Sequence, residues 1–149
     1  LSACESFENM ATAKHIKLNI HLPESTLPDC ICDSDRIIQV LTIFLHNAIS
    51  YTPEGGSICL SLVHLNKCFE IKISDTGIGI SDEEKGKIFD RFYRSNKARN
   101  DKNHFGLGLS IAYDIITAHY GNIKVTDTPG GGTTFIITLC NQPISKFTF

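Results

Sequence analysis

Three short groups of residues have the types and spacing that chemistry on a bound ligand requires. The first is Asn47, an amide on an otherwise apolar face of a segment with helical periodicity. The second runs from Asp75 to Ile80 and places Gly77 and Gly79 after the carboxylate. A carboxylate accepts hydrogen bonds, which suits an exocyclic amine such as that of adenine, and glycines let the backbone approach a flat ligand closely.

The third group runs from His104 to Leu109 and opens a second segment with helical periodicity. Glycines at the start of a helix expose backbone N–H groups to an anion, and the helix dipole adds to the attraction. The run matches neither a complete GxGxxG fingerprint after a strand nor a P-loop. Taken alone, each of the three groups also has a structural explanation: a satisfied amide, a tight glycine turn and an ordinary helix start.

A local excess of positive charge lies between the second and third groups. Residues 91–105 contain one acid, Asp101, and the following five basic residues: Arg91, Arg94, Lys97, Arg99 and Lys102. In a chain of net charge -2, this asymmetry suits a triphosphate. The alternative is a solvated loop.

The composition limits the classes of protein to consider. A chain of 149 residues with 42% hydrophobic and 20% charged residues indicates one globular domain. A net charge of -2 and a pI near 6.3 argue against a general nucleic-acid binder, and the apolar runs are too short to span a bilayer. Because the first residue is Leu1, we expect the chain to be a piece of a longer protein.

The six cysteines are predicted to be buried, reduced thiols of a cytosolic domain rather than a disulfide framework. Cys59 and Cys68 lie inside apolar runs typical of strands, and Cys30 and Cys32 are only two residues apart. A zinc site is not expected, since the chain has no CxxC and its six histidines are scattered.

Periodicity and capping residues predict the elements that would position these groups. Alternation over 15–22 predicts a strand, and apolar spacing predicts a helix that Asp33 or Ser34 caps and that ends near Tyr51, because Pro53 follows closely. The other expected elements are strands over 57–65, 69–74, 122–126 and 133–139, a short helix capped by Ser81 and running through Phe89, and a helix over 107–119 that Gly121 terminates. This order predicts an α/β (α+β) two-layer sandwich, with a mixed, mostly antiparallel sheet covered on one face by helices.

Taken in order, the groups resemble the ATP-binding catalytic domain of bacterial sensor histidine kinases, within the gyrase–Hsp90–histidine kinase–MutL superfamily. The resemblance covers about residues 14–140. It rests on an N box at 46–53, a first glycine box at 75–79, an F box at 88–94 and a second glycine box at 105–109. It implies a Bergerat-type ATP-binding fold, with 1–13 as a linker or the end of a preceding helix, 14–141 as the catalytic domain and 142–149 as a tail.

The resemblance also implies roles for individual residues. Asp75 would accept from the adenine amine, Gly77, Gly79 and Ile80 would shape the adenine pocket, and Tyr51 would pack near the base or ribose. Asn47 would hold a Mg²⁺ that bridges the phosphates, and Arg94 would reach the γ-phosphate. Gly106 and Gly108 would let the lid and the following helix close on the triphosphate, and the same nucleotide-binding group would include Phe105, Leu107 and Leu109.

Three positions depart from the pattern of the family, and one of them is His104, which stands where a first glycine is common. Ile43 stands where a second Asn is frequent, and Ser50 stands where a Lys or Arg often meets phosphate. The departures at Ile43 and Ser50 motivate an alternative hypothesis, a nucleotide-binding pseudokinase or scaffold module. A water-activating ATPase is disfavoured, because the 36–53 segment contains no Asp or Glu.

The resemblance further implies the partners of the domain. The phosphoryl acceptor would be a histidine on a separate dimerisation domain of the same parent protein, and a response regulator would act downstream. No histidine in this chain has the H-[ED]-x-x-x-P setting of the acceptor. The resemblance also implies that this is a cytoplasmic domain of a membrane-bound parent. Because the acceptor motif is missing, we expect the chain alone to bind ATP and scarcely to phosphorylate itself.

Overall fold

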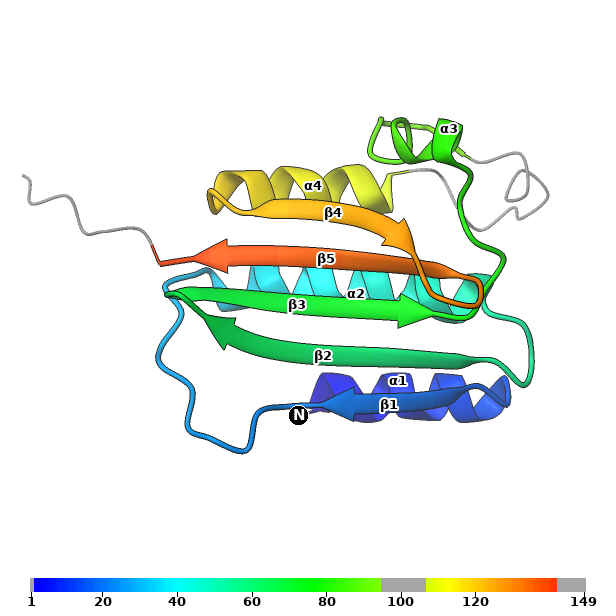
Figure 1. Cartoon of the computed structure of the whole chain (residues 1–149), viewed down its shortest axis with the longest axis horizontal. Helices are drawn as coiled ribbons and strands as arrows, with labels where there is room; N and C mark the ends of the chain where they lie inside the picture. The colour runs from blue at the N-terminus through cyan, green and yellow to red at the C-terminus, as the bar shows by residue number, and fades with distance from the viewer. Residues whose placement is uncertain (1, 95–106, 142–149) are drawn as a thin grey trace, which may run out of the picture.

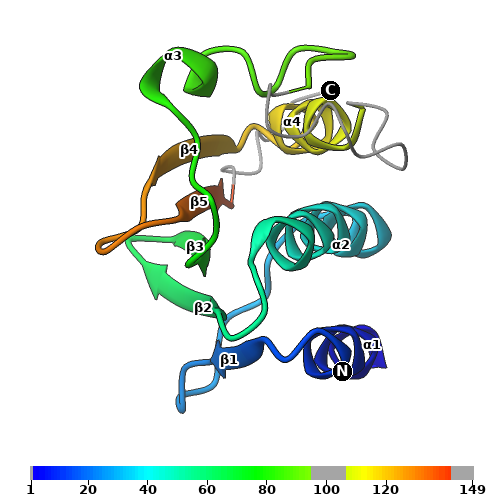
Figure 2. The same cartoon turned by 90° about the vertical axis from the view of Figure 1, so that its right-hand side faces the viewer.

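The protein folds as two layers, a five-stranded sheet and a layer of helices on one of its faces (Figures 1 and 2). The structure is a computed structural model that describes residues 2–94 and 107–141. Its elements are α1 (Ser2–Ala13), β1 (Lys17–His21), α2 (Ser34–Tyr51), β2 (Ser57–Leu65), β3 (Cys68–Asp75), α3 (Asp82–Lys85), α4 (Gly108–Ala118), β4 (Asn122–Asp127) and β5 (Thr133–Cys140).

The strand order is β1-β2-β3-β5-β4. β1 runs parallel to β2, and the other neighbouring pairs are antiparallel, which confirms the predicted mixed, mostly antiparallel sheet. Alternate residues face the helices: Phe69, Ile71 and Ile73 of β3 are buried. β5 enters between β3 and β4, so the segment before β5 comes to lie beside the end of β3.

The long helix α2 follows the predicted pattern at both ends. The Asp33 side chain accepts a hydrogen bond from the backbone N–H of Arg36 (3.2 Å), which satisfies one of the free donors of the first turn. The helix ends at Tyr51, because Pro53 lacks an N–H group and disfavours helical geometry in the residue before it. Phe44 is fully buried and its ring lies 4.7 Å from that of Phe135 on β5.

The N-terminal helix α1 packs in the same layer, beside α2 (Figure 2). Its Phe7 and Ala11 are buried in the hydrophobic core of the domain. The chain then turns at His15, which has a positive φ of 55°, and continues into β1. No helix within the two described ranges is long and apolar enough to cross a membrane.

Two helix predictions need correction. Ser81 does cap α3, since its hydroxyl accepts from Glu84 N–H (3.3 Å), but the regular helix ends at Lys85 rather than Phe89, and turns follow it. The residue that terminates α4 in a left-handed conformation is Tyr120 (φ 56°), not Gly121. Gly121 is required for a different reason, because a Cβ there would lie 2.7 Å from the carbonyl oxygen of Thr138.

The prediction that all six cysteines are reduced was wrong for one pair. Cys68 and Cys140 are directly opposite each other on β3 and β5, and they form a disulfide. Because 72 residues separate them in the chain, only the strand order brings them together. Cys30, Cys32 and Cys59 are free thiols, and burial, with Cys32 close by, raises the pKa of Cys30 to about 11.

Candidate functional site

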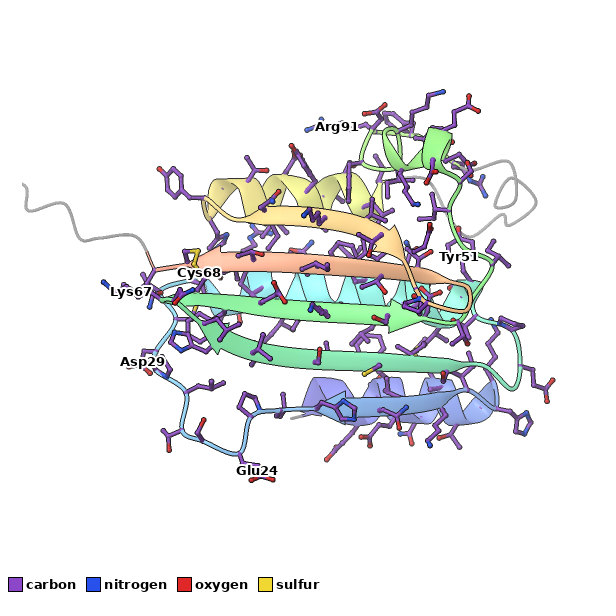
Figure 3. The ribbon with its side chains drawn as sticks, viewed as in Figure 1. Glu24, Asp29, Tyr51, Lys67, Cys68 and Arg91 are labelled. Carbon is purple, nitrogen blue, oxygen red and sulfur yellow. A yellow bond between two sulfur atoms is a disulfide. The ribbon has the colours of Figure 1, made fainter. Side chains whose placement is uncertain are left out.

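A cavity of about 130 Å³ opens at the edge of the domain where α2 and β3 end and α4 begins. Figure 3 labels Tyr51 at this end of the sheet and Cys68 at the opposite end. The predicted site residues that line the cavity are Asn47, Tyr51, Asp75, Gly79, Ile80, Arg94, Gly108 and Leu109. Residues from four separate segments of the sequence therefore meet around one space.

Asp75 is the last residue of β3 and is only 5% exposed. Its Oδ1 accepts two backbone hydrogen bonds, from the N–H of Gly77 (2.9 Å) and from the N–H of Thr133 (3.1 Å). Burial raises the pKa of the Asp75 carboxyl, and the two N–H donors partly oppose this shift. Because both donors use Oδ1, the carboxyl is held in one orientation and Oδ2 remains as an acceptor for a ligand.

Two glycines bring the backbone close enough to make this arrangement. A Cβ on Gly77 would lie 2.5 Å from the carbonyl oxygen of Tyr51. Gly132 has a φ of 109°, and a Cβ there would overlap the Asp75 carbonyl oxygen. Gly77 thus lets the loop after β3 approach the end of α2, while Gly79, with a φ of 73°, lines the cavity itself.

Asn47 and Tyr51 are one helical turn apart on α2, so both side chains face the cavity. The Tyr51 carbonyl accepts a hydrogen bond from Ile78 N–H (3.3 Å), which joins the end of α2 to the loop after β3. Arg94 lines the cavity, whereas Arg91, labelled in Figure 3, is exposed and pairs with Asp114 of α4 (3.2 Å). The two arginines of the F box therefore have different surroundings.

Some predicted residues lie elsewhere. Leu107 immediately precedes α4 and is not among the cavity-lining residues, and Phe105 and Gly106 lie outside the described ranges, as does the basic stretch from 95 onward. Ile43 packs against Gly108, since a Cβ added to Gly108 would lie 3.3 Å from Cγ2 of Ile43. Neither Ile43 nor Ser50 lines the cavity.

Sequence reasoning missed several residues of the cavity wall. These are Ala48, Ile78, Ile88, Tyr93, Thr133 and Phe135. The sequence signal beside Thr133 is the preceding run of three glycines, and nothing in the sequence pattern places that run near Asp75. Tyr93 donates from its hydroxyl to Glu84 Oε1 (3.2 Å), so the segment after α3 is tied to α3 beside the cavity.

The described residues contain no group of three or more His, Cys, Asp or Glu side chains able to hold a metal ion. Besides the Asp75 carboxylate, the cavity lining includes the Asn47 amide, whose oxygen could bind a metal, and the Arg94 guanidinium, which is a cation that could meet a phosphate. A single amide oxygen is a weak protein ligand set, but Mg²⁺ is often held by one or two protein ligands together with substrate phosphates and water.

Residues 32–143 match the family of histidine kinase-, DNA gyrase B-, and HSP90-like ATPases. The chain belongs to this family. It is 38% identical over 136 residues to the adaptive-response sensory kinase SasA of Crocosphaera subtropica, a match that covers 91% of this chain and 35% of that protein. It is 41% identical over 134 residues to the sensor histidine kinase WalK of Bacillus subtilis, covering 87% and 22%. The chain thus spans about a third or less of these relatives.

Solved structures place the fold within one branch of the family. The mycobacterial sensor histidine kinase MprB superposes with a TM-score of 0.80 at 28% identity, over 95% of each chain. The catalytic domain of the histidine kinase ThkA superposes with a TM-score of 0.82 at 27% identity, over 95% of this chain and 91% of that one. The prediction of an ATP-binding catalytic domain of the two-component sensor kinase type is confirmed.

Proposed function

We propose that this chain binds ATP in the cavity beside Asp75 and supplies its γ-phosphoryl group to a histidine on a separate dimerisation domain. The observation that supports this most directly is the buried Asp75 carboxyl, whose Oδ1 is occupied by two backbone N–H groups. Oδ2 would accept from the exocyclic amine of adenine. Apolar side chains of Ile78, Ile80 and Phe135 line the same cavity and suit the faces of a flat base.

The phosphates would extend from the base toward Arg94 and the start of α4. Gly108 begins this helix and lines the cavity, so its free N–H groups and the helix dipole favour an anion there. Asn47 would hold a Mg²⁺ through its amide oxygen, and the metal would neutralise charge on the phosphates. Ile43 packs on Gly108 and is not a lining residue of the cavity. Its apolar side chain therefore does not occupy space where the phosphates or the metal would bind.

In phosphoryl transfer this domain would position the ATP and stabilise its negative charge, and it would form no covalent intermediate. A neutral imidazole nitrogen of the acceptor would attack the γ-phosphorus in line as the bond to the β–γ bridging oxygen breaks, which releases ADP. Arg94 would offset the negative charge on the transferred group. The acceptor histidine would belong to the dimerisation domain of the same parent protein. A response regulator would then take the phosphoryl group from this histidine. The parent protein would be membrane-bound, with this domain in the cytoplasm.

A calorimetric titration with ATP, with and without Mg²⁺, tests the proposal, and Asp75→Asn serves as the variant. We expect binding that strengthens with Mg²⁺ and weakens in Asp75→Asn. Transfer of labelled phosphate to an added cognate dimerisation domain then tests the kinase step. Binding through Asp75 that ignores Mg²⁺ and supports no transfer would contradict the kinase proposal and favour the scaffold alternative.

A further inference from the structure

The C-terminal end of α2 lacks a cation of its own. A helix leaves its last carbonyl groups without partners, and its negative dipole end favours a positive charge. The last turn of α2 contains no basic residue. Thr52 N–H still reaches the carbonyl of Ala48 (3.0 Å), but Pro53 has no N–H to offer the carbonyl of Ile49.

Lys14 supplies the missing cation from another element. Its Nζ donates to the carbonyl of Ile49 (2.7 Å) and to the carbonyl of Ser50 (2.9 Å), 35 and 36 residues away in the sequence. The next carbonyl, that of Tyr51, accepts from Ile78 N–H (3.3 Å). Two consecutive carbonyls therefore bind Lys14, and the third binds the loop that lines the cavity.

Lys14 is itself held firmly by α1. It is the first residue after the helix, and its N–H reaches back to the carbonyls of Met10 (3.3 Å) and Ala11 (3.1 Å). Ala11 is buried against the rest of the core. The backbone carbonyl of the next residue, His15, accepts a hydrogen bond from the N–H of Gly55 (3.0 Å) in the turn after α2. This bond is a second connection between the end of α1 and the end of α2.

We infer that Lys14 is a positioning residue for nucleotide binding, through which α1 fixes the Tyr51 and Ile78 side of the cavity. This inference rests on the proposed function. Without the ammonium group, two half-buried carbonyls lose a charged partner, and the last turn of α2 must loosen to reach water. Tyr51 belongs to that turn, so its ring and the hydrogen bond to Ile78 would loosen with it.

The test compares Lys14→Met, which keeps the apolar stem, with Lys14→Arg, which keeps the charge and donors. Lys17→Met is the matched control, because Lys17 is an exposed lysine three residues later on β1. Each variant is titrated with ATP at a temperature where thermal unfolding shows it fully folded. We expect Lys14→Met to weaken ATP binding about fivefold, Lys14→Arg to restore it, and Lys17→Met to leave it unchanged.

Hydrogen exchange of the Ile78 amide, measured by NMR without nucleotide, gives a second readout. We expect faster exchange at Ile78 in Lys14→Met and unchanged exchange at the Thr133 amide, which is bonded to Asp75 instead. A lower melting temperature with unchanged ATP affinity and unchanged Ile78 exchange would overturn the inference and leave Lys14 with a stabilising role only. An equal loss of affinity in Lys17→Met would also overturn it.

Two further arms keep the outcomes distinct. If Lys14→Met does not fold, Lys14→Gln, which keeps a donor without the charge, takes its place under the same criteria. If the wild-type chain fails to bind ATP, or if Asp75→Asn binds it as well as wild type, the proposed function fails. The exchange rate at Ile78 then still decides whether Lys14 positions this loop.

Discussion

Replacing Asp75 by Asn should weaken ATP binding and stabilise the free protein at the same time. The Asn amide oxygen still accepts from Gly77 and Thr133 N–H, so the loop geometry is kept. The NH₂ group of Asn then takes the place of Oδ2. Because this group and the exocyclic amine of adenine are both donors, they cannot form the hydrogen bond that Oδ2 would accept. Losing one charge-assisted hydrogen bond costs about 1.5–3 kcal/mol, or about 10- to 150-fold in Kd.

The effect on stability follows from the pKa of Asp75. Burial raises this pKa in the folded state, so the ionised carboxyl opposes folding once the pH exceeds the unfolded value of about 4. The cost grows as the pH rises to the folded pKa and is then constant. Asp75→Asn should therefore unfold at a higher temperature than wild type at pH 7, and the difference should disappear as the pH falls toward about 4.

Calorimetric titration gives the affinity, and thermal unfolding without nucleotide at several pH values gives the stability difference. A variant that binds ATP as well as wild type would refute the assignment of Asp75 to the adenine. A variant that is less stable than wild type at pH 7 would refute the reasoning from burial, because the two backbone donors would then outweigh desolvation.

Three other changes give further tests. Gly132→Ala should weaken ATP binding at least tenfold and lower the free energy of unfolding by about 2 kcal/mol or more. Gly131→Ala, also at positive φ but in open space, should lower the free energy of unfolding less and leave ATP binding unchanged. Equal losses of affinity and stability in the two variants would refute the steric argument. Reducing the Cys68–Cys140 disulfide should lower the unfolding free energy in urea by about 4 kcal/mol without changing ATP affinity, since it lies at the other end of the sheet; changed affinity would contradict this. Thr52→Val should raise stability by about 1 kcal/mol, because its buried hydroxyl has no hydrogen-bond partner among the described residues; a lower melting temperature would contradict this.

The sequence by itself determined most of the helices and strands and many of the residues that line the cavity. The alternation through Ile71 and Ile73 predicted a strand, and Asp33 and Pro53 predicted both ends of α2, because side-chain period, capping and proline sterics act within a few residues. For the same reason Asp75, at the end of its strand, was identifiable from the glycines that follow it.

The tertiary structure decided which distant groups complete the site. The Thr133 amide reaches Asp75 across 58 residues, and Lys14 reaches Ile49 across 35. The disulfide that sequence analysis did not expect joins residues 72 apart. The Thr133 and disulfide contacts depend on β5 lying beside β3, and the Lys14 contact depends on α1 lying beside α2. Neither local periodicity nor capping specifies which elements become neighbours.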